Sequence, residues 1–184
     1  LVTGVQTCAL PIFDVLFPET DRTSPSSAVE LWALNGPMRE QLLALPDHDK
    51  VFAQSLTQTP AVLGFALEQS EQNEGGDFPL QKGRFIYAGE DQSRWLTSYS
   101  RAVRSLPSLE QVASGNGAVT FVPDADGVIL RVPLVLQVGQ KPVGTLASES
   151  LRVALGARNV VLKSASGASG IEEVRIGQLT IDRK

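Results

Sequence analysis

Short apolar runs alternate with helix-like spacing in the first third of the chain. Residues 13–17 (FDVLF) and 60–67 (PAVLGFAL) are compact apolar runs of the kind that form buried strands. Between them, residues 51–56 have the spacing of a helix with one apolar face, and Asp47 stands where an N-cap is expected. A strand, a helix and a second strand in this order predict a βαβ unit with parallel strands and a right-handed crossover.

Two further short helices are predicted in the connection between these strands. Residues 28–34 follow Ser27, and Glu30 stands three positions after that serine, which is the pattern of a capping box. Residues 38–45 form the second helical stretch, which Pro46 ends.

The middle of the chain predicts an antiparallel hairpin. Residues 118–122 alternate and are rich in strand-forming residues, and residues 128–138 form a longer apolar run. The Pro-Asp-Ala-Asp-Gly sequence at 123–127 between them is typical of a tight turn. A calcium loop is the weaker interpretation, because the third oxygen position and the distal glutamate of such a loop are missing.

The last part of the chain predicts one helix and then strands. Residues 148–155 have helical spacing, and the (i, i+3) pair Glu149 and Arg152 is expected on the exposed face of this helix. Three strands follow, at 159–163, 171–176 and 178–181. The expected fold is therefore α/β with a mixed sheet: a parallel βαβ part, then an antiparallel hairpin and a helix, with the helices packed on the sheet.

Length and composition restrict the class of protein. The 184 residues suit one domain, and a formal net charge of −4 argues against a nucleic-acid partner. No apolar run is long enough to span a bilayer, and the single Cys8 allows no internal disulfide framework. One histidine, His48, leaves little basis for a multi-histidine metal site, so we expect neither a metal nor a cofactor.

Residues 1–12 do not fit the rest of the chain. They lack the positive start of a signal peptide, and Pro11 and Asp14 interrupt the apolar stretch. Residues 2–12 (VTGVQTCALPI) instead resemble the in-frame translation of a common sequencing adapter. We therefore expect residues 1–12 to be non-native, and residues 13–184 to be a single domain truncated at both ends.

A polar loop leaves the carboxyl end of the first predicted strand. Ligands of open α/β sheets tend to bind outside the carboxyl ends of strands. The candidate ligand-binding residues are therefore Asp14, Glu19, Asp21 and Arg22. The alternative is that Asp21 and Arg22 form a solvated ion pair and that Asp14 caps backbone groups.

Four stretches of the chain resemble one protein family, the CHASE2 domain. They are residues 13–22 (FDVLFPETDR), 115–136 (GNGAVTFVPDADGVILRVPLVL), 146–156 (LASESLRVALG) and 170–181 (GIEEVRIGQLTI). Two positions depart from the family pattern, since Thr20 replaces a proline and Leu130 replaces an arginine that often precedes Arg131. These departures weaken the case for a polar site at those positions and leave the fold expectation unchanged.

The resemblance implies an extracytoplasmic sensory domain of a membrane-bound signalling receptor. Such a domain binds a small molecule or another environmental signal, is anchored by flanking membrane helices, and passes the signal to a cytoplasmic cyclase, histidine kinase or Ser/Thr kinase. The resemblance implies no catalytic residues in this segment. Whether the domain forms a homodimer stays open.

Two other functions are alternatives to this interpretation. A small periplasmic hydrolase needs a nucleophile and a base, but the chain has no G-x-S-x-G elbow and only His48 as a histidine base. His48 close to a serine hydroxyl in a pocket would favour that function. A structural spacer that carries dimer contacts without a ligand is the third possibility.

Overall fold

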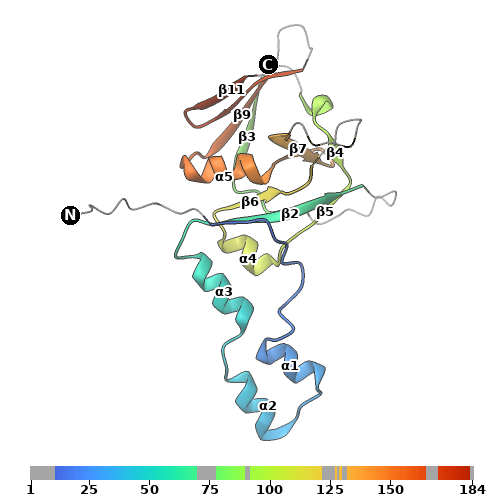
Figure 1. Cartoon of the computed structure of the whole chain (residues 1–184), viewed down its shortest axis with the longest axis vertical. Coiled ribbons are helices and arrows are strands. Elements are labelled where there is room, and N and C mark those ends of the chain that lie inside the picture. The colour runs from blue at the N-terminus through green and yellow to red at the C-terminus, as the bar shows by residue number, and fades with distance from the viewer. Residues whose placement is uncertain are drawn as a thin grey trace, which may run out of the picture.

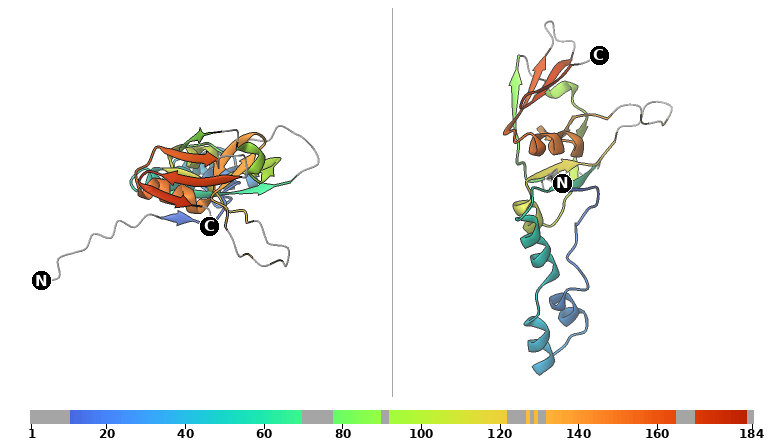
Figure 2. Two further views of the ribbon diagram at one scale, coloured as in Figure 1. Left: turned by 90° about the horizontal axis from the view of Figure 1, so that it is seen from above. Right: turned by 60° about the vertical axis from the view of Figure 1, so that its left-hand side comes forward.

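The computed structural model describes residues 11–69, 78–89, 92–121, 127, 129, 132–164 and 170–182. Three small β-sheets and one helix between them form the body of the molecule, and a helical arm extends from one end (Figure 1). The C-terminus lies at the opposite end of the body (Figure 1). Two further views show the same elongated arrangement (Figure 2).

The first sheet contains the predicted parallel pair. Strand β1 (Ile12–Phe13) and strand β6 (Gly115–Ala118) both pair parallel with β2 (Val62–Glu68), and β5 (Arg101–Val103) pairs antiparallel with β2. The parallel pairing of the two N-terminal apolar runs is therefore confirmed.

The first strand is shorter than its apolar run predicted, because it leaves the sheet after Phe13. Strand β5 pairs with β2 from Ala66 onward, and the Ser105 hydroxyl donates a hydrogen bond to the Gly64 carbonyl at 3.2 Å. The backbone of β2 beyond Leu63 thus finds its partners in a later segment of the chain.

The other two sheets are built from later segments of the chain. One has the order β11–β10–β9–β3, in which the three predicted C-terminal strands pair antiparallel and β3 lies parallel to β9 at the edge. The other has the order β4–β7–β8. Their bounds are β3 Arg84–Ala88, β4 Ser98–Tyr99, β7 Val135–Val138, β8 Lys141–Gly144, β9 Asn159–Ser164, β10 Ile171–Ile176 and β11 Leu179–Asp182.

The predicted pairing of residues 118–122 with residues 128–138 is wrong where the structure describes both segments. Ala118 pairs with Phe65 in β2, while β7 has β8 on one edge and β4 on the other. The hairpin forms instead at Gly139, whose φ of +58° suits the two-residue turn that joins β7 directly to β8. The turn expected at 123–127 lies, except for Gly127, outside the described residues.

The helices surround the first sheet on two sides. Helices α3 and α4 bury Leu56 and Leu109 against β2, and α5 lies on the other side, between this sheet and the C-terminal one (Figure 1). The bounds are α1 Pro25–Leu31, α2 Gly36–Leu43, α3 His48–Leu56, the short 3₁₀ helix Ser93–Trp95, α4 Pro107–Val112 and α5 Leu146–Ala154.

One predicted helix cap is present and the other is absent. Asp47 accepts a hydrogen bond from the Lys50 backbone N–H at 3.1 Å, as an N-cap does. Helix α1, however, starts three residues earlier than predicted, with Pro25 in its first turn. The Ser27 hydroxyl therefore sits inside the helix and donates to the Asp21 carbonyl instead of forming a capping box.

The expectation that Glu149 and Arg152 lie on an exposed face is wrong. Their exposed fractions are only 4% and 7%, and two nitrogens of the guanidinium bond the two carboxylate oxygens at 2.8 and 2.7 Å. Arg152 also donates to the carbonyls of Ser114 and Ala157. The covering segments come from distant residues, so the (i, i+3) spacing gave no sign of this burial.

A second buried carboxylate holds the segment 78–83 against the body. Glu110 accepts both Arg104 Nη2 at 2.6 Å and the Leu80 backbone N–H at 3.3 Å. The Asn116 amide donates to the Leu80 carbonyl. Burial lowers the pKa of Lys82, against the opposing charge of Glu110, and the Lys82 ammonium donates to the Gln111 carbonyl. Residues 78–83 thus close over the buried ion pairs.

Breaking the buried pair should destabilise the protein far more than breaking a surface pair. The Arg152→Met variant leaves the Glu149 carboxylate buried without its partner, so the free energy of unfolding should fall by about 3–5 kcal/mol. The matched control is Arg22→Met, because Arg22 and Glu19 form an (i, i+3) pair that is 84% and 70% exposed. That control should change stability by less than about 1 kcal/mol in urea denaturation. Equal losses for both variants would contradict the role given to the buried pair.

Candidate functional site

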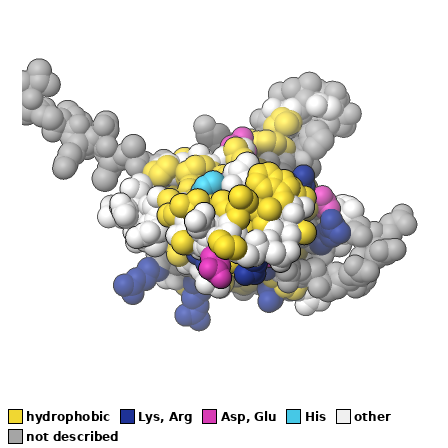
Figure 3. Space-filling view, turned by 90° about the horizontal axis from the view of Figure 1, so that it is seen from below, with side chains coloured by type: hydrophobic (Ala, Val, Ile, Leu, Met, Phe, Trp, Pro, Cys, Tyr) yellow, Lys and Arg dark blue, Asp and Glu magenta, His cyan; other side chains and the backbone are white. Residues whose placement is uncertain are grey.

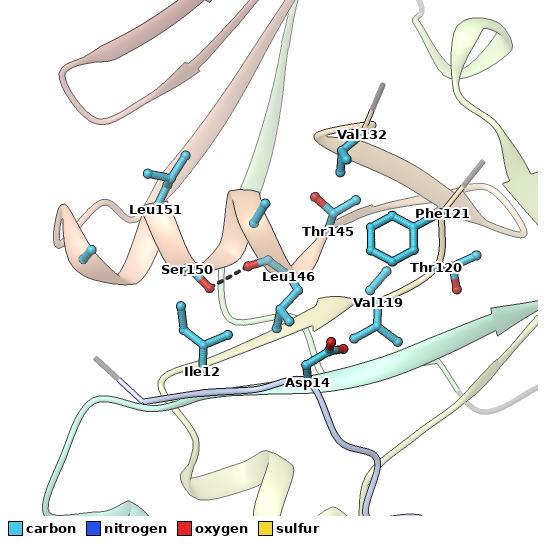
Figure 4. A pocket seen from close by; sticks show the side chains of 13 residues that line it. Ile12, Asp14, Val119, Thr120, Phe121, Val132, Thr145, Leu146, Ser150 and Leu151 are labelled. Atoms are coloured by element: carbon cyan, nitrogen blue, oxygen red, sulfur yellow. Dashed lines mark hydrogen bonds between the residues drawn. The ribbon is translucent and has the colours of Figure 1, made fainter. Parts of the chain in front are cut away.

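A groove of about 580 Å³ opens between helix α5 and the first sheet. Figure 4 shows it from close by, with α5 on one side and β1 and β6 on the other. Its lining comes from four separate parts of the chain: Ile12, Asp14, Ala118, Val119, Thr120, Phe121, Val132, Thr145, Leu146, Ala147, Ser150, Leu151 and Ala154.

Two glycines bring the groove's walls together. A Cβ on Gly117 would lie 2.6 Å from the Leu146 Cα, so only glycine lets the start of α5 lie this close to β6. A Cβ on Gly64 would lie 2.8 Å from the Val119 Cγ1, which explains why a lone glycine stands in the middle of β2.

The groove lies at the carboxyl ends of two parallel strands, β1 and β6. Side chains alternate along β1, so that Ile12 and Asp14 line the groove. Phe13 instead packs against Phe17 and Phe52, with ring centroids 6.0 and 5.7 Å away. This is the edge of an α/β sheet at which ligands usually bind.

The groove surface is mainly apolar. Nine of its thirteen lining residues have apolar side chains, and Asp14 is the one ionisable residue among them. The hydroxyls of Thr145 and Ser150 already donate to the carbonyls of Leu134 and Leu146, at 3.3 and 2.6 Å. Figure 4 places the Asp14 carboxylate below Val119 and Leu146, at the edge of the groove. The arrangement suits an apolar molecule with a donor or a positive charge at one end.

The four candidate residues from the sequence do not form one site. Asp14 lines the groove, and Glu19, Asp21 and Arg22 do not. The alternative that paired Asp21 with Arg22 is also wrong, because Arg22 bonds Glu19 at 2.8 Å. Asp21 instead accepts from the backbone N–H and hydroxyl of Thr23, both at 2.7 Å.

Asp21 belongs to a polar junction that fixes the loop to the start of α3. The hydrogen bonds from Thr23 are the main cause that lowers the pKa of Asp21, with a smaller contribution from His48. The Asp21 backbone N–H donates to Asp49, and the backbone N–H of His48 donates to the Ser24 hydroxyl. These contacts position the helical arm, and none of these residues lines the groove.

The cluster of Thr23, His48 and Asp21 lacks the geometry of a catalytic triad. Both Thr23 and Asp21 approach the same ring nitrogen, Nδ1 of His48, at 3.4 and 3.2 Å. A relay needs the nucleophile on one ring nitrogen and the carboxylate on the other. The His48 side chain is also half exposed. The arrangement therefore gives a hydrolase no support.

Sequence reasoning missed the α5 wall of the groove. A signal was present, because Ala147, Ser150 and Ala154 recur at helical spacing and leave room beside the helix. Within the described ranges, no three His, Cys, Asp or Glu side chains gather as metal ligands. Among those same residues, no helix has the length and hydrophobicity needed to cross a membrane.

The Asp47 cap makes part of the stability of the arm depend on pH. Hydrogen bonds from the Ser26 hydroxyl and the Lys50 backbone N–H lower the pKa of Asp47 below its ordinary value of 3.8. The stabilisation is therefore present above pH 3.8 and is lost as the pH falls through the lower, folded value. We expect Asp47→Ala to cost about 1 kcal/mol at pH 7, and this difference from the wild type to vanish in acid. Urea denaturation at several pH values tests this, and a difference that stays constant into acid would contradict it.

Comparison with known protein families identifies the family of this chain. The family model of the CHASE2 domain matches residues 9–183, which is nearly the whole chain and begins four residues before the boundary predicted at Phe13. No curated protein and no solved structure gave a significant match. The resemblance seen in the sequence is thus confirmed, and the chain belongs to the CHASE2 family of extracellular sensory domains.

Proposed function

We propose that this chain senses a ligand in the periplasm or at the outer cell surface, as part of a membrane-bound receptor whose cyclase or kinase acts inside the cell. The family is sensory, and a sensor needs a site that a signal molecule can occupy. The single observation that carries the proposal is the apolar groove beside α5 with Asp14 at its edge. Residues Glu19, Asp21 and Arg22 have other partners and have no part in it.

The groove's chemistry favours one class of ligand. Its volume of about 580 Å³ lies within the range of small-molecule sites. The apolar walls favour an aliphatic or aromatic body, and the Asp14 carboxylate favours an ammonium or another donor at the end of the ligand. An anionic ligand would meet the same carboxylate unfavourably.

A ligand in the groove has a direct physical route to the C-terminal sheet. Leu151 of α5 lines the groove and also packs with Val160, Leu162 and Ile176 of β9 and β10. A ligand that shifts α5 must therefore repack this cluster near the C-terminus. Such a ligand transmits a signal only if it binds two arrangements of α5 with different affinities.

A fluorescent dye and three ten-carbon competitors test the site. The neutral dye N-phenyl-1-naphthylamine should fluoresce in the groove, and decylamine should displace it more effectively than decanol or decanoate. Ala147→Trp fills the groove from an exposed position and should abolish dye binding. Its control is Gln54→Trp, on α3 and outside the groove lining, which should bind the dye like the wild type.

The Asp14→Asn variant tests the charge of Asp14, because it removes the charge and keeps the size of the side chain. Asp14 is exposed, so its attraction for an ammonium group is a surface interaction of roughly 0.5–1 kcal/mol. The preference for decylamine over decanol should therefore fall about 2- to 5-fold, while decanol affinity stays unchanged. Equal dye binding by Ala147→Trp and the wild type would place the ligand elsewhere and overturn the proposed site.

The DNA that flanks the coding region tests whether the chain is part of a membrane-bound receptor. Sequencing outward from the DNA that encodes residues 13–184 should reveal membrane-spanning segments and a cyclase or kinase domain in the same reading frame. A stop codon close to Lys184, with no membrane segment on either side, would overturn the proposed receptor.

A further inference from the structure

The tip of the helical arm exposes an unusually apolar surface. Helix α2 buries none of its residues and packs mainly against α1 (Figures 1 and 2). Figure 3 shows this end of the molecule, where hydrophobic side chains lie close together over the arm. We call this surface the tip patch and define it as Leu31, Trp32, Met38, Leu43, Leu45 and Val51, all exposed by 44% or more.

The arm's own packing does not explain why it is ordered. Helices α1 and α2 have only seven and eight residues. Isolated helices shorter than about 12–15 residues are marginal in water, so these two depend on packing against something else. Val29 and Pro25 are the buried residues of α1, and α2 has none. The exposed apolar side chains, Leu31 at 74% and Trp32 at 65%, are the surface still available for such packing.

The size of the tip patch matches one half of a protein interface. Six large side chains exposed to this degree present roughly 600 Å², close to the ~800 Å² that each partner contributes to a standard interface. Trp32 is also the residue type that most often dominates binding energy at such interfaces. The patch is at the upper limit of what a monomer usually leaves exposed.

The charges around the tip patch favour a second copy of this chain over a membrane. The exposed charged residues of α1 and α2 are Glu30, Arg39 and Glu40, and Lys50 of α3 is exposed beside Val51. Two acidic and two basic side chains do not make the surface basic, as a lipid-binding helix face usually is. Arg39 and Glu40 form no ion pair with any residue that the structure describes. A two-fold axis that passes beside this part of α2 would bring Arg39 of one copy to Glu40 of the other, and the reverse.

We propose that the chain forms a symmetric dimer through the tip patch, with Trp32 at its centre and two Arg39–Glu40 pairs at its edge. The arm points away from the end that holds the C-terminus (Figure 1), so the dimer leaves the α5 groove of both copies open. The proposal is independent of any ligand, because it concerns a surface outside the groove.

Sedimentation equilibrium of the 184-residue chain, without ligand, tests the dimer. The wild type should show a concentration-dependent monomer–dimer equilibrium. Trp32→Glu combined with Met38→Glu should raise the dimer dissociation constant at least about 30-fold, which is the loss expected for one hot-spot residue. Leu155→Glu is the control, since Leu155 is 48% exposed and lies at the end of α5 outside the patch, and it should dimerise like the wild type.

Charge-swapped variants test the pairing without removing apolar surface. Arg39→Glu alone and Glu40→Arg alone should each dimerise more weakly, because like charges then face each other across the two-fold axis. An equimolar mixture of the two variants should form a heterodimer that restores both pairs. Circular dichroism should show unchanged helix content for each variant, because both positions are exposed.

Three results would overturn the proposal. They are a wild type that stays monomeric up to millimolar concentration, a dimer that the Trp32→Glu, Met38→Glu variant does not weaken, and variants of opposite charge that fail to combine. Vesicles of anionic phospholipid provide the remaining test. Co-sedimentation that depends on Trp32 would assign the tip patch to a membrane surface instead, and its absence is the expected result.

Discussion

The architecture depends on a pair of opposite charges that is almost completely buried. Glu149 and Arg152 lie on the side of α5 that faces the interior, and the guanidinium also bonds the carbonyls of Ser114 and Ala157. These two carbonyls belong to the segments that enter β6 and β9, so one side chain joins the first sheet to the C-terminal one. A buried ion pair is a poor source of net stability compared with apolar packing. It does, however, restrict the position of α5, because a shift of the helix carries both side chains with it and breaks the Arg152 hydrogen bond to the Ser114 carbonyl.

That constraint explains why the groove exists. A helix held by its polar side has its small residues, Ala147, Ser150 and Ala154, on the opposite side, and these leave space beside the sheet. Glycines supply the close approach that the buried pair requires, since a Cβ on Gly115 would lie 2.8 Å from the Glu149 Cγ. The same helix therefore contributes one wall of the groove and the link to β9 and β10. A molecule in the groove contacts one side of α5, while the buried ion pair on its other side restricts where the helix can lie.

The sequence allowed the strands to be predicted better than the contacts between them. Residues 60–67 and the three C-terminal strands stood out because continuous or alternating apolar runs reflect burial directly. The partners of β7 were not predictable, because a local turn at Gly139 competed with a turn signal at 123–127 that was just as strong. The burial of Glu149 was hidden as well, since its cover comes from residues 83 and 115, far away in the chain. Of the polar candidates only Asp14 lines the groove, and it was found because it follows a parallel strand at its carboxyl end.

The proposed dimer contact lies at the tip of the arm, and the groove lies in the body between α5 and the first sheet (Figure 1). This separation has a physical consequence. A dimer through the arm fixes the distal ends of two copies, while the C-terminal sheets at the other end stay free to change their relative position (Figure 1). In such a dimer, α5 lies between the arm, which is held by the dimer contact, and the C-terminal sheet, which is free to move. The arm is joined to the body through the packing of Leu56 and Leu109, and the hydrogen bonds at the start of α3 hold the segment before α1 to α3. The rigidity of this junction then decides whether a change in the groove moves the C-termini of the two copies relative to each other or is absorbed in the arm.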